Sequence, residues 1–207
     1  MTDPLADPRT AELLGADPQA AIVLAGVLRK AASESSYTSL GLAAVQHDGT
    51  WTGRAADAFR SAIGRLPGRL GRLGAGLETV AQALVHYESS LADIQPAFVN
   101  VIAELERAEA RLPALAKVQS GADGALLTAA VTPGTGRAEL GRAEVEAARA
   151  DGAVSGCLGE IARLRRRAFE LLDEFGAARQ SATAAIVAAR DGAPVPPPYG
   201  SGVTTVG

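Results

Sequence analysis

The sequence contains a single cysteine, Cys157, among 207 residues. One cysteine excludes an intrachain disulfide and any zinc site built on a Cys-x-x-Cys pair. Histidine is nearly as scarce, because His47 and His86 are the only two, so a histidine metal ligand or general base is poorly supported. Glutamate is more plentiful, but no Glu-x-x-His pair occurs, which argues against a di-metal site in a helical bundle. We therefore expect a protein that is not an enzyme and has no metal and no cofactor.

Aromatic residues and long apolar runs are also rare. Aromatic residues make up 4% of the chain, and much of the 47% hydrophobic content is alanine, which predicts thin layers of closely packed helices. The best apolar segment, residues 20–28, is less than half of the ~20 residues that a membrane-spanning helix needs. The N-terminus is acidic and has no basic start followed by an apolar run, so a cleaved secretory signal is not expected. These features predict a soluble chain without a membrane span.

Charge excludes another class of partner. The formal net charge is −3 and the pI is about 5.5. No overall positive field therefore draws the chain to nucleic acid or to acidic membranes.

A heptad pattern organises the region from Phe59 to Leu115. Two seams of apolar residues, each repeating every seven positions, run through it without a break. Such a stripe keeps one side of a helix facing a partner helix. We predict an all-α fold, an elongated antiparallel helical bundle. The seams are Phe59, Leu66, Leu73, Val80, Tyr87, Ile94, Val101, Ala108 and Leu115, and Ile63, Leu70, Leu77, Leu84, Leu91, Phe98, Leu105 and Leu112.

The first half of the chain predicts a helical hairpin. Residues 1–17 form an N-terminal segment with Asp-Pro turn signals, and the last of these, Asp17-Pro18, predicts a helix start. That helix should run to about Gln46, with Gly49 as the left-handed residue beyond its end. A second helix then carries the heptads. Prolines at 67 and 96 should kink it rather than break it, because the heptad continues in phase through both.

The second half predicts a loop, a long helix and a tail. Residues 118–136 are rich in Gly, Ser, Asp and Pro, which predicts a loop. Residues 137–190 carry a small-apolar stripe at alternating three- and four-residue spacing, typical of a helix of about fifty residues. The simplest arrangement folds this helix back on the second one, with Leu140 near Leu112 and Ala189 near Ile63. Residues 191–207 are rich in Pro and Gly and predict a disordered or polyproline tail, either bare or acting as a Pro-rich ligand.

A Trp-Thr-Gly turn, residues 51–53, separates the two helices of the hairpin. Gly53 permits backbone geometry that a Cβ would hinder. Trp51, the only tryptophan, can cover the open end of the two helices and bury 150–250 Å², a typical value for an aromatic side chain. Two interpretations stay open, a plug for the hairpin end and an exposed recognition surface, and they are compatible.

Arginine supplies the sharpest charge cluster, Arg163, Arg165, Arg166 and Arg167. The first interpretation is a solvated face whose arginines pair with Glu160 and Glu170 at helical spacing. The alternative is a docking surface for an acidic partner. The absence of nearby aromatic residues argues against nucleic acid.

Residues 51–60 carry a family resemblance. The segment Trp51-Thr52-Gly53-Arg54-Ala55-Ala56-Asp57-Ala58-Phe59 resembles the Trp-x-Gly-x-Ala-Ala-x-x-Phe signature of the WXG100 (ESAT-6-like) superfamily. The continuation through Tyr87 and Gln95 is similar to the actinobacterial helical domain at the front of type VII-secreted toxins. The resemblance covers about residues 18–115 and implies a WXG100-like hairpin over 18–117. It also implies pairing with another helical hairpin and export by the type VII machinery without a cleaved signal.

The chain departs from the family in its export signal. The expected Tyr-x-x-x-Asp/Glu motif is missing, and Phe169 to Asp173 is its nearest approximation. A partner that supplies the signal, or a relative that is not exported, would account for this. Residues 137–190 lie outside the resemblance and could replace a separate partner hairpin.

The resemblance implies a recognition set for a partner or for the secretion machinery: Trp51, Gly53, Phe59, Tyr87, Phe169 and Asp173. We expect a type VII secretion substrate or targeting module, exported from the cytoplasm, which binds a WXG100-like partner or itself and the secretion ATPase. Such a module can be the leading domain of a toxin. The alternative is a structural or adaptor coiled-coil protein that dimerises through its helical seam.

Overall fold

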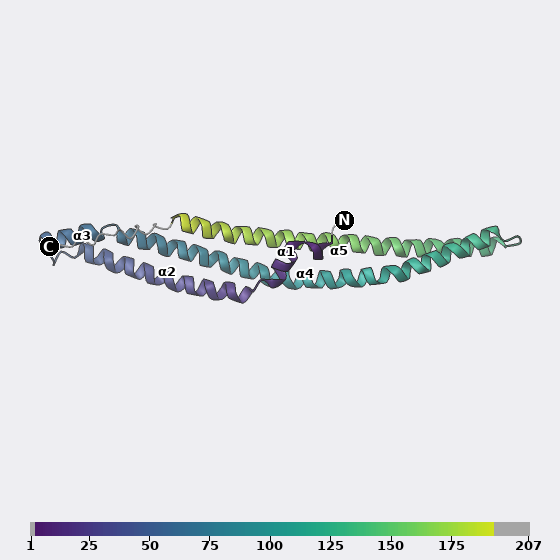
Figure 1. The fold of residues 1–207 in the computed structure, drawn as a ribbon, viewed down its shortest axis with the longest axis horizontal. Coiled ribbons are helices and arrows are strands. Elements are labelled where there is room, and N and C mark those ends of the chain that lie inside the picture. The colour runs from purple at the N-terminus through teal and green to yellow at the C-terminus, as the bar shows by residue number, and fades with distance from the viewer. Residues whose placement is uncertain (1–2, 193–207) are drawn as a thin grey trace, which may run out of the picture. The chain divides into compact units, whose positions relative to one another are not determined.

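The computed structural model describes residues 3–192 and shows an all-α helical bundle (Figure 1). No strand occurs in this range. The tail predicted over 191–207 falls outside the described residues, except that Asp191 and Gly192 end the last helix. The elements are a 3-10 helix η1 (Pro4–Ala6) and the α-helices α1 (Pro8–Gly15), α2 (Pro18–His47), α3 (Arg54–Ile63), α4 (Leu66–Val131) and α5 (Arg137–Gly192).

The chain divides into two compact units, and both α4 and α5 pass through each of them. Unit 1 comprises Met1–Ala16 and Ala92–Gly176, whereas unit 2 comprises Asp17–Leu91 and Ala177–Gly207. Each unit is described by itself.

Asp-Pro pairs start the first three helices. Asp3, Asp7 and Asp17 are the N-caps of η1, α1 and α2, and each side chain accepts a hydrogen bond of 2.9 Å from the backbone N–H two residues on. Proline suits the next position because the first helical N–H has no partner within the helix. The helix start predicted at Asp17-Pro18 is confirmed. The same signal at Asp7-Pro8 starts α1, although turn signals alone were predicted for residues 1–17.

In unit 1, α4 packs against α5 in the opposite direction. The Cys157 thiol donates to the carbonyl oxygen of Ala108 at 3.3 Å, and Gln119 Nε2 donates to Asp151 Oδ1 at 3.0 Å, so later positions in α4 meet earlier positions in α5. The core around these contacts contains Leu105, Ala108, Cys157, Ile161 and Leu164.

Helix α1 is attached to unit 1 by polar contacts. Gln95 Nε2, from α4, donates to the carbonyl oxygens of Leu13 and Ala16 at 2.7 and 2.8 Å. These bonds satisfy carbonyls at the end of α1 that have no partner within the helix. Arg9 Nη1 donates to Asp173 Oδ1, on α5, at 2.6 Å. The side chain of Leu13 is fully buried, so α1 contributes to the core of unit 1.

In unit 2, α4 lies between α2 and α5 (Figure 1). The α2 hydroxyls of Ser35 and Ser39 donate to the carbonyl oxygens of Leu70 and Pro67 at 2.8 and 2.7 Å, so these two helices also run in opposite directions. On the other side, Gly76 lies beside Ala189 of α5. The core is small, with Ala25, Ala81 and Leu84 at its centre.

The sequence predicted the apolar stripes of α4 and α5 well, but it did not predict the register in which α5 packs on α4. Every member of the stripe in α5, from Leu140 to Ala189, is buried or half-buried, and so are all seam positions except Phe59 and Leu66. However, Ala189 lies beside Gly76 and not near Ile63. The predicted pairing of Leu140 with Leu112 fails for the same reason, because α4 continues well beyond Leu112 before the chain reverses.

The loop predicted over 118–136 is wrong for most of its length. Helix α4 continues to Val131, and only residues 132–136 connect it to α5, with Gly134 in the left-handed region at φ +95°. The stripe that faces α5 continues through Ala122, Leu126 and Ala129, which are half-buried. This packing offsets the helix cost of Gly121 and Gly124, about 1 kcal/mol each.

The two prolines predicted to kink the second helix behave differently. At Pro67 the helix breaks, since Gly64 and Arg65 form a turn and Pro67 lies in the first turn of α4. Pro96 lies inside a continuous helix, as expected, and so does Pro113. A proline at a helix start costs nothing in hydrogen bonding, which favours a new start at Leu66 over a kink.

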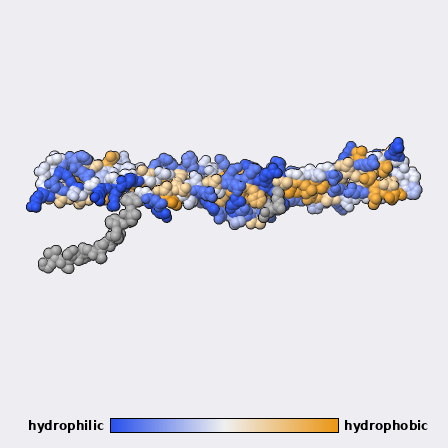
Figure 2. Space-filling model, turned by 90° about the horizontal axis from the view of Figure 1, so that it is seen from above, coloured by the Kyte–Doolittle hydropathy of each residue, from blue (hydrophilic) through white to orange (hydrophobic). Residues whose placement is uncertain are grey.

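Hydrophobic side chains are exposed in each unit. In unit 1 they gather at the end that carries the α4–α5 turn, as Figure 2 shows, and include Val118, Leu127, Val131 and Val145. In unit 2 they lie mostly on α2 and include Ile22, Val23, Leu24, Val27, Tyr37, Leu40 and Val45. Alanine and serine fill the buried side of α2, so its larger apolar side chains point outward.

Candidate functional site: the Trp51 turn

The Trp51 turn, residues 48–53, connects α2 to α3 in unit 2. Asp48 ends α2, and its Oδ1 accepts hydrogen bonds from the backbone N–H of Thr50 at 2.8 Å and from its hydroxyl at 2.6 Å. These bonds favour the ionised carboxylate, so the Thr50 hydroxyl and N–H hold the pKa of Asp48 below its usual value. A short polar turn therefore precedes Trp51.

Gly53 gives the turn its backbone geometry. It is the N-cap of α3 at φ +101° and ψ 176°, a conformation essentially limited to glycine. A Cβ built on Gly53 would meet nothing within 4 Å, so conformation and not space requires the glycine. Gly49 was expected to be the left-handed residue, and this is wrong because its φ is not positive. Asp48 ends α2 in an extended conformation instead.

Arg60 braces the turn from α3. Its Nη2 donates to the backbone carbonyl oxygens of Asp48, at 2.9 Å, and of Trp51, while Nη1 donates to Asp57 Oδ1 at 3.3 Å. One planar guanidinium thus connects Asp48 and Trp51 of the turn to α3. Sequence reasoning missed Arg60, because its main acceptors are backbone carbonyls and leave no residue pattern.

Trp51 packs on Phe59 and stays partly exposed. The ring centroids are 5.3 Å apart at an interplanar angle of 57°, a favourable tilted pair. Trp51 retains 45% of its accessible surface and Phe59 retains 37%. Trp51 therefore packs on Phe59 while part of its surface stays exposed to solvent.

The remaining members of the predicted recognition set are divided between the units. Tyr87 is half-buried on α4 in unit 2 and lines a groove of about 410 Å³ between α4 and α5, together with His86, Ser90 and Ser181. Phe169 and Asp173 lie one turn apart on α5 in unit 1, where Asp173 binds Arg9. The structure brings Trp51, Gly53 and Phe59 together at one turn; the recognition role of all six residues stays a prediction.

Two of the four arginines in the α5 cluster, Arg165 and Arg167, form internal ion pairs. Arg167 binds Glu170 and Glu174 at 3.2 and 3.0 Å, which raises the pKa of Arg167, and Arg165 binds Glu109 of α4 at 2.7 Å. The expected pairing with Glu170 is thus confirmed. Pairing with Glu160 is wrong, because Glu160 binds Arg111 of α4 instead. Within residues 3–192, Arg163 and Arg166 form no ion pair.

Residues suited to chemistry are scattered. Over residues 3–192, no group of three or more His, Cys, Asp and Glu side chains is placed to hold a metal ion. Cys157 is buried, and His47 Nδ1 lies 2.7 Å from the carbonyl oxygen of Ala43 one turn earlier. Among the described helices, none is by itself long and apolar enough to cross a membrane. Only α1 and α2 taken together have the length and apolar composition, and they are bent by 61° relative to each other.

Comparison with known proteins gives no relative. No family model, no curated protein and no solved structure matches this chain.

Proposed function

We propose that this protein is a non-enzymatic helical module for type VII secretion, as a substrate or as a targeting domain. It would bind a helical partner, the secretion machinery or both, and would leave the cytoplasm by that route. The observation that carries this proposal is the presentation of Trp51. A half-exposed tryptophan stands on a turn that Gly53 shapes and Arg60 braces. A ring that served only as a plug would gain by deeper burial.

The arrangement of the helices supports the same proposal. We infer an elongated antiparallel bundle, in which α2 and α4 form a hairpin about the Trp51 turn and α5 folds back along α4. The bonds from Ser35 to Leu70 and from Ser39 to Pro67 support the hairpin within unit 2. Together with the resemblance of residues 51–59 to the WXG100 signature, this favours a secretion module, such as the leading domain of a toxin.

Export of variants tests the proposal. In an actinobacterial host with a type VII system, we expect Trp51→Ala to reduce the exported fraction at least several-fold while helicity and thermal unfolding stay near wild type. Tyr37→Ala is the matched control, because Tyr37 is also an exposed aromatic residue of unit 2, outside the turn. Export of Trp51→Ala at the wild-type level, or equal loss in both variants, would contradict the proposal.

A second candidate function is an adaptor that dimerises through its helices. The exposed apolar side chains of α2 favour it, with Val23 and Val27 among the most accessible. Sedimentation should then show a dimer at micromolar concentration, and Val23→Glu with Val27→Glu should dissociate it. A monomer in the wild type would exclude this candidate and leave the first untouched.

A further inference from the structure

The first turns of α4 carry an arginine stripe that has no counter-charge. Residues 54–77 contain five arginines and one carboxylate, Asp57, which binds Arg60. Arg65, Arg69 and Arg72 form no ion pair with any residue from 3 to 192. Arg65 and Arg72 are exposed and Arg69 is half-buried.

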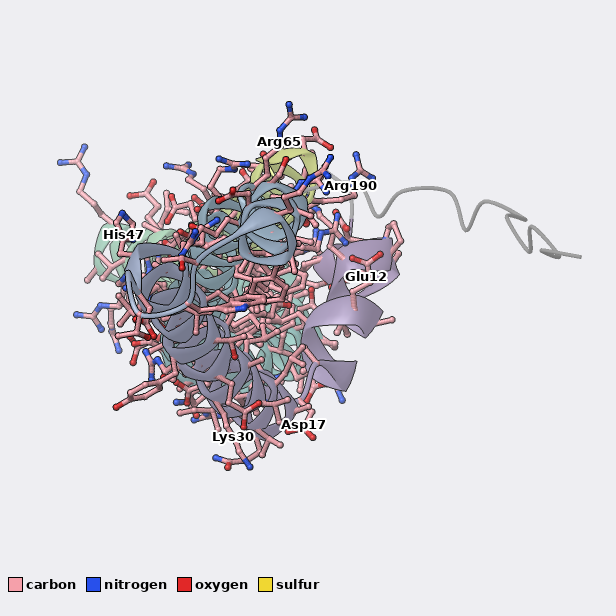
Figure 3. All side chains as sticks on the ribbon, turned by 90° about the vertical axis from the view of Figure 1, so that its left-hand side faces the viewer. Glu12, Asp17, Lys30, His47, Arg65 and Arg190 are labelled. Atoms are coloured by element: carbon pink, nitrogen blue, oxygen red, sulfur yellow. The ribbon has the colours of Figure 1, made fainter. Side chains whose placement is uncertain are left out.

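This stripe continues the surface on which α5 lies. Arg65 directly precedes α4, and its carbonyl oxygen accepts a hydrogen bond of 3.2 Å from the N–H of Arg69. Arg65, Arg69, Arg72 and Gly76 follow one another at spacings of four, three and four residues, so they share one side of α4 and its start. Gly76 contacts Ala189 of α5, and Arg72 borders the shallow groove that Gly76 forms with Ala189 and Gly192. Figure 3 shows Arg65 on the same side of unit 2 as Arg190 of α5, with Lys30 of α2 on the opposite side.

Over its described residues, helix α5 covers this side up to Arg72. It ends at Gly192, while α2 still covers the other side of α4 through Ser39 and Pro67. Next to the arginines, Leu66 retains 40% of its accessible surface and Leu73 is half-buried, so the leucine seam is also incompletely covered there. Among residues 3–192, none therefore occupies, over residues 65–72, the position that α5 occupies farther along α4.

We propose that this surface, Arg65, Arg69, Arg72 and Leu66, binds an acidic amphipathic helix from a partner protein. The partner helix lies along α4 beyond the end of α5, its apolar side on Leu66 and its carboxylates on the arginines. Arginine suits this role because its guanidinium binds carboxylates through paired, charge-assisted hydrogen bonds. Residues 193–207, which follow α5, contain no Asp or Glu, so they cannot supply the side-chain carboxylates that this surface would bind.

This inference relocates the acidic docking surface predicted on α5. Two of the four arginines predicted there, Arg165 and Arg167, are already paired within unit 1. The inference rests on the part of the proposed function in which the chain binds a helical partner, and it does not require export.

Peptide binding to the full-length protein tests the inference. The probe is a fluorescent synthetic peptide of about three heptads, with leucine along one seam and glutamate beside it. We expect saturable binding that weakens as salt increases. Arg65→Glu with Arg69→Glu should weaken it by roughly a hundredfold, about tenfold for each reversed charge. Arg65→Gln with Arg69→Gln, a milder change, should weaken it less.

The control reverses Arg163 and Arg166, which are likewise unpaired but lie on α5 in unit 1. Equal weakening by both pairs would show a response to net charge and would overturn the proposal, as would unchanged binding in the Arg65 and Arg69 variants. If the same arginines bind phosphatidylglycerol vesicles but not the peptide, the surface recognises a lipid surface and the proposal of a protein partner is overturned. Peptide binding by Trp51→Ala at the wild-type level separates this surface from the Trp51 turn, whatever the outcome for export.

Discussion

Gly74 of α4 lies directly against Ala32 of α2. A Cβ built on Gly74 would come within 3.0 Å of the Ala32 carbonyl oxygen and 2.9 Å of the Ser36 hydroxyl. Backbones approach this closely only where a side chain is missing. The contact explains why α2 presents alanine and serine toward α4, and why the larger apolar residues of α2 remain on its outer side.

Substitution of Gly74 should separate α2 from α4. Alanine forms helices better than glycine by about 1 kcal/mol, but at this position its Cβ would overlap backbone that cannot rotate away. We expect Gly74→Ala to lower the free energy of unfolding by about 1–3 kcal/mol. Urea-induced unfolding, monitored by circular dichroism, measures this change in the free energy of unfolding.

Gly71 provides the control for this contact. A Cβ on Gly71 would meet only the Ser39 hydroxyl, at 3.7 Å, an ordinary van der Waals distance. Gly71→Ala should therefore raise the free energy of unfolding by up to about 1 kcal/mol. If Gly74→Ala and Gly71→Ala both stabilise the protein, α2 and α4 do not approach each other as closely at Gly74 as the structure shows.

A second prediction concerns Gly53. An L-residue at φ +101° and ψ 176° is strained, so Gly53→Ala should destabilise the fold by about 1–3 kcal/mol in thermal unfolding. Gly49→Ala, a few residues earlier, should be close to neutral because Gly49 has no positive φ and a Cβ there meets nothing within 4 Å. If Gly49→Ala destabilised the protein more than Gly53→Ala, the prediction that Gly53 is the conformationally constrained glycine would be contradicted.

A third prediction concerns the brace formed by Arg60. Arg60→Ala removes the donors to the carbonyl oxygens of Asp48 and Trp51 and should cost about 1 kcal/mol, since the carbonyls can turn to water. Because Trp51 is the only tryptophan, its fluorescence reports on this turn alone. We expect a red-shifted emission maximum with unchanged helicity. Arg54→Ala, an exposed arginine of the same helix, should leave the emission unchanged; equal spectra for both variants would refute the brace.

The sequence predicts local features of this fold better than its long-range register. Apolar spacing is a property of one helix, so the stripe of α5 and its burial were correctly predicted. Loop composition was misleading, because Gly121 and Gly124 suggest a loop only if packing against α5 is ignored. That packing depends on residues about thirty positions away, such as Asp151, which accepts from Gln119. The register of α5 on α4 likewise depends on residues far apart in the sequence, and for this reason Ala189 lies beside Gly76 and not near Ile63 as predicted.

The candidate site shows the same limit. The sequence pattern of the turn is recognisable because it contains two aromatic residues, Trp51 and Phe59, and a glycine, Gly53, whose backbone conformation excludes other residues. Arg60 could not be recognised, since it acts on backbone carbonyls. The arginine cluster of α5 was conspicuous in the sequence, but Glu109 and Glu174 are brought to it by the fold and by helical spacing. The stripe from Arg65 to Arg72 became evident only when α5 was seen to end beside it.

The last prediction concerns the pH dependence of α1 docking. Hydrogen bonds from the Arg9 guanidinium hold the pKa of Asp7 below its usual value near 3.8, and Arg9 also binds Asp173. Because the folded state binds the Asp7 proton less tightly than the unfolded chain does, the stabilisation is complete above the usual aspartate pKa. It is lost as pH falls through the lowered pKa of the folded state. Acidification below about pH 4 should therefore loosen α1 before the helices of the core unfold.

The methyl NMR signals of Leu13, which is buried in unit 1, report on this docking as pH is lowered. Asp7→Asn is the informative variant, because asparagine still caps α1 but does not titrate. It should weaken docking at neutral pH and remove part of the acid-dependent change, whereas Asp3→Asn, at the N-cap of η1, should preserve both. An acid transition of Leu13 that is identical in Asp7→Asn and wild type would show that the Asp7–Arg9 pair does not hold α1 in place.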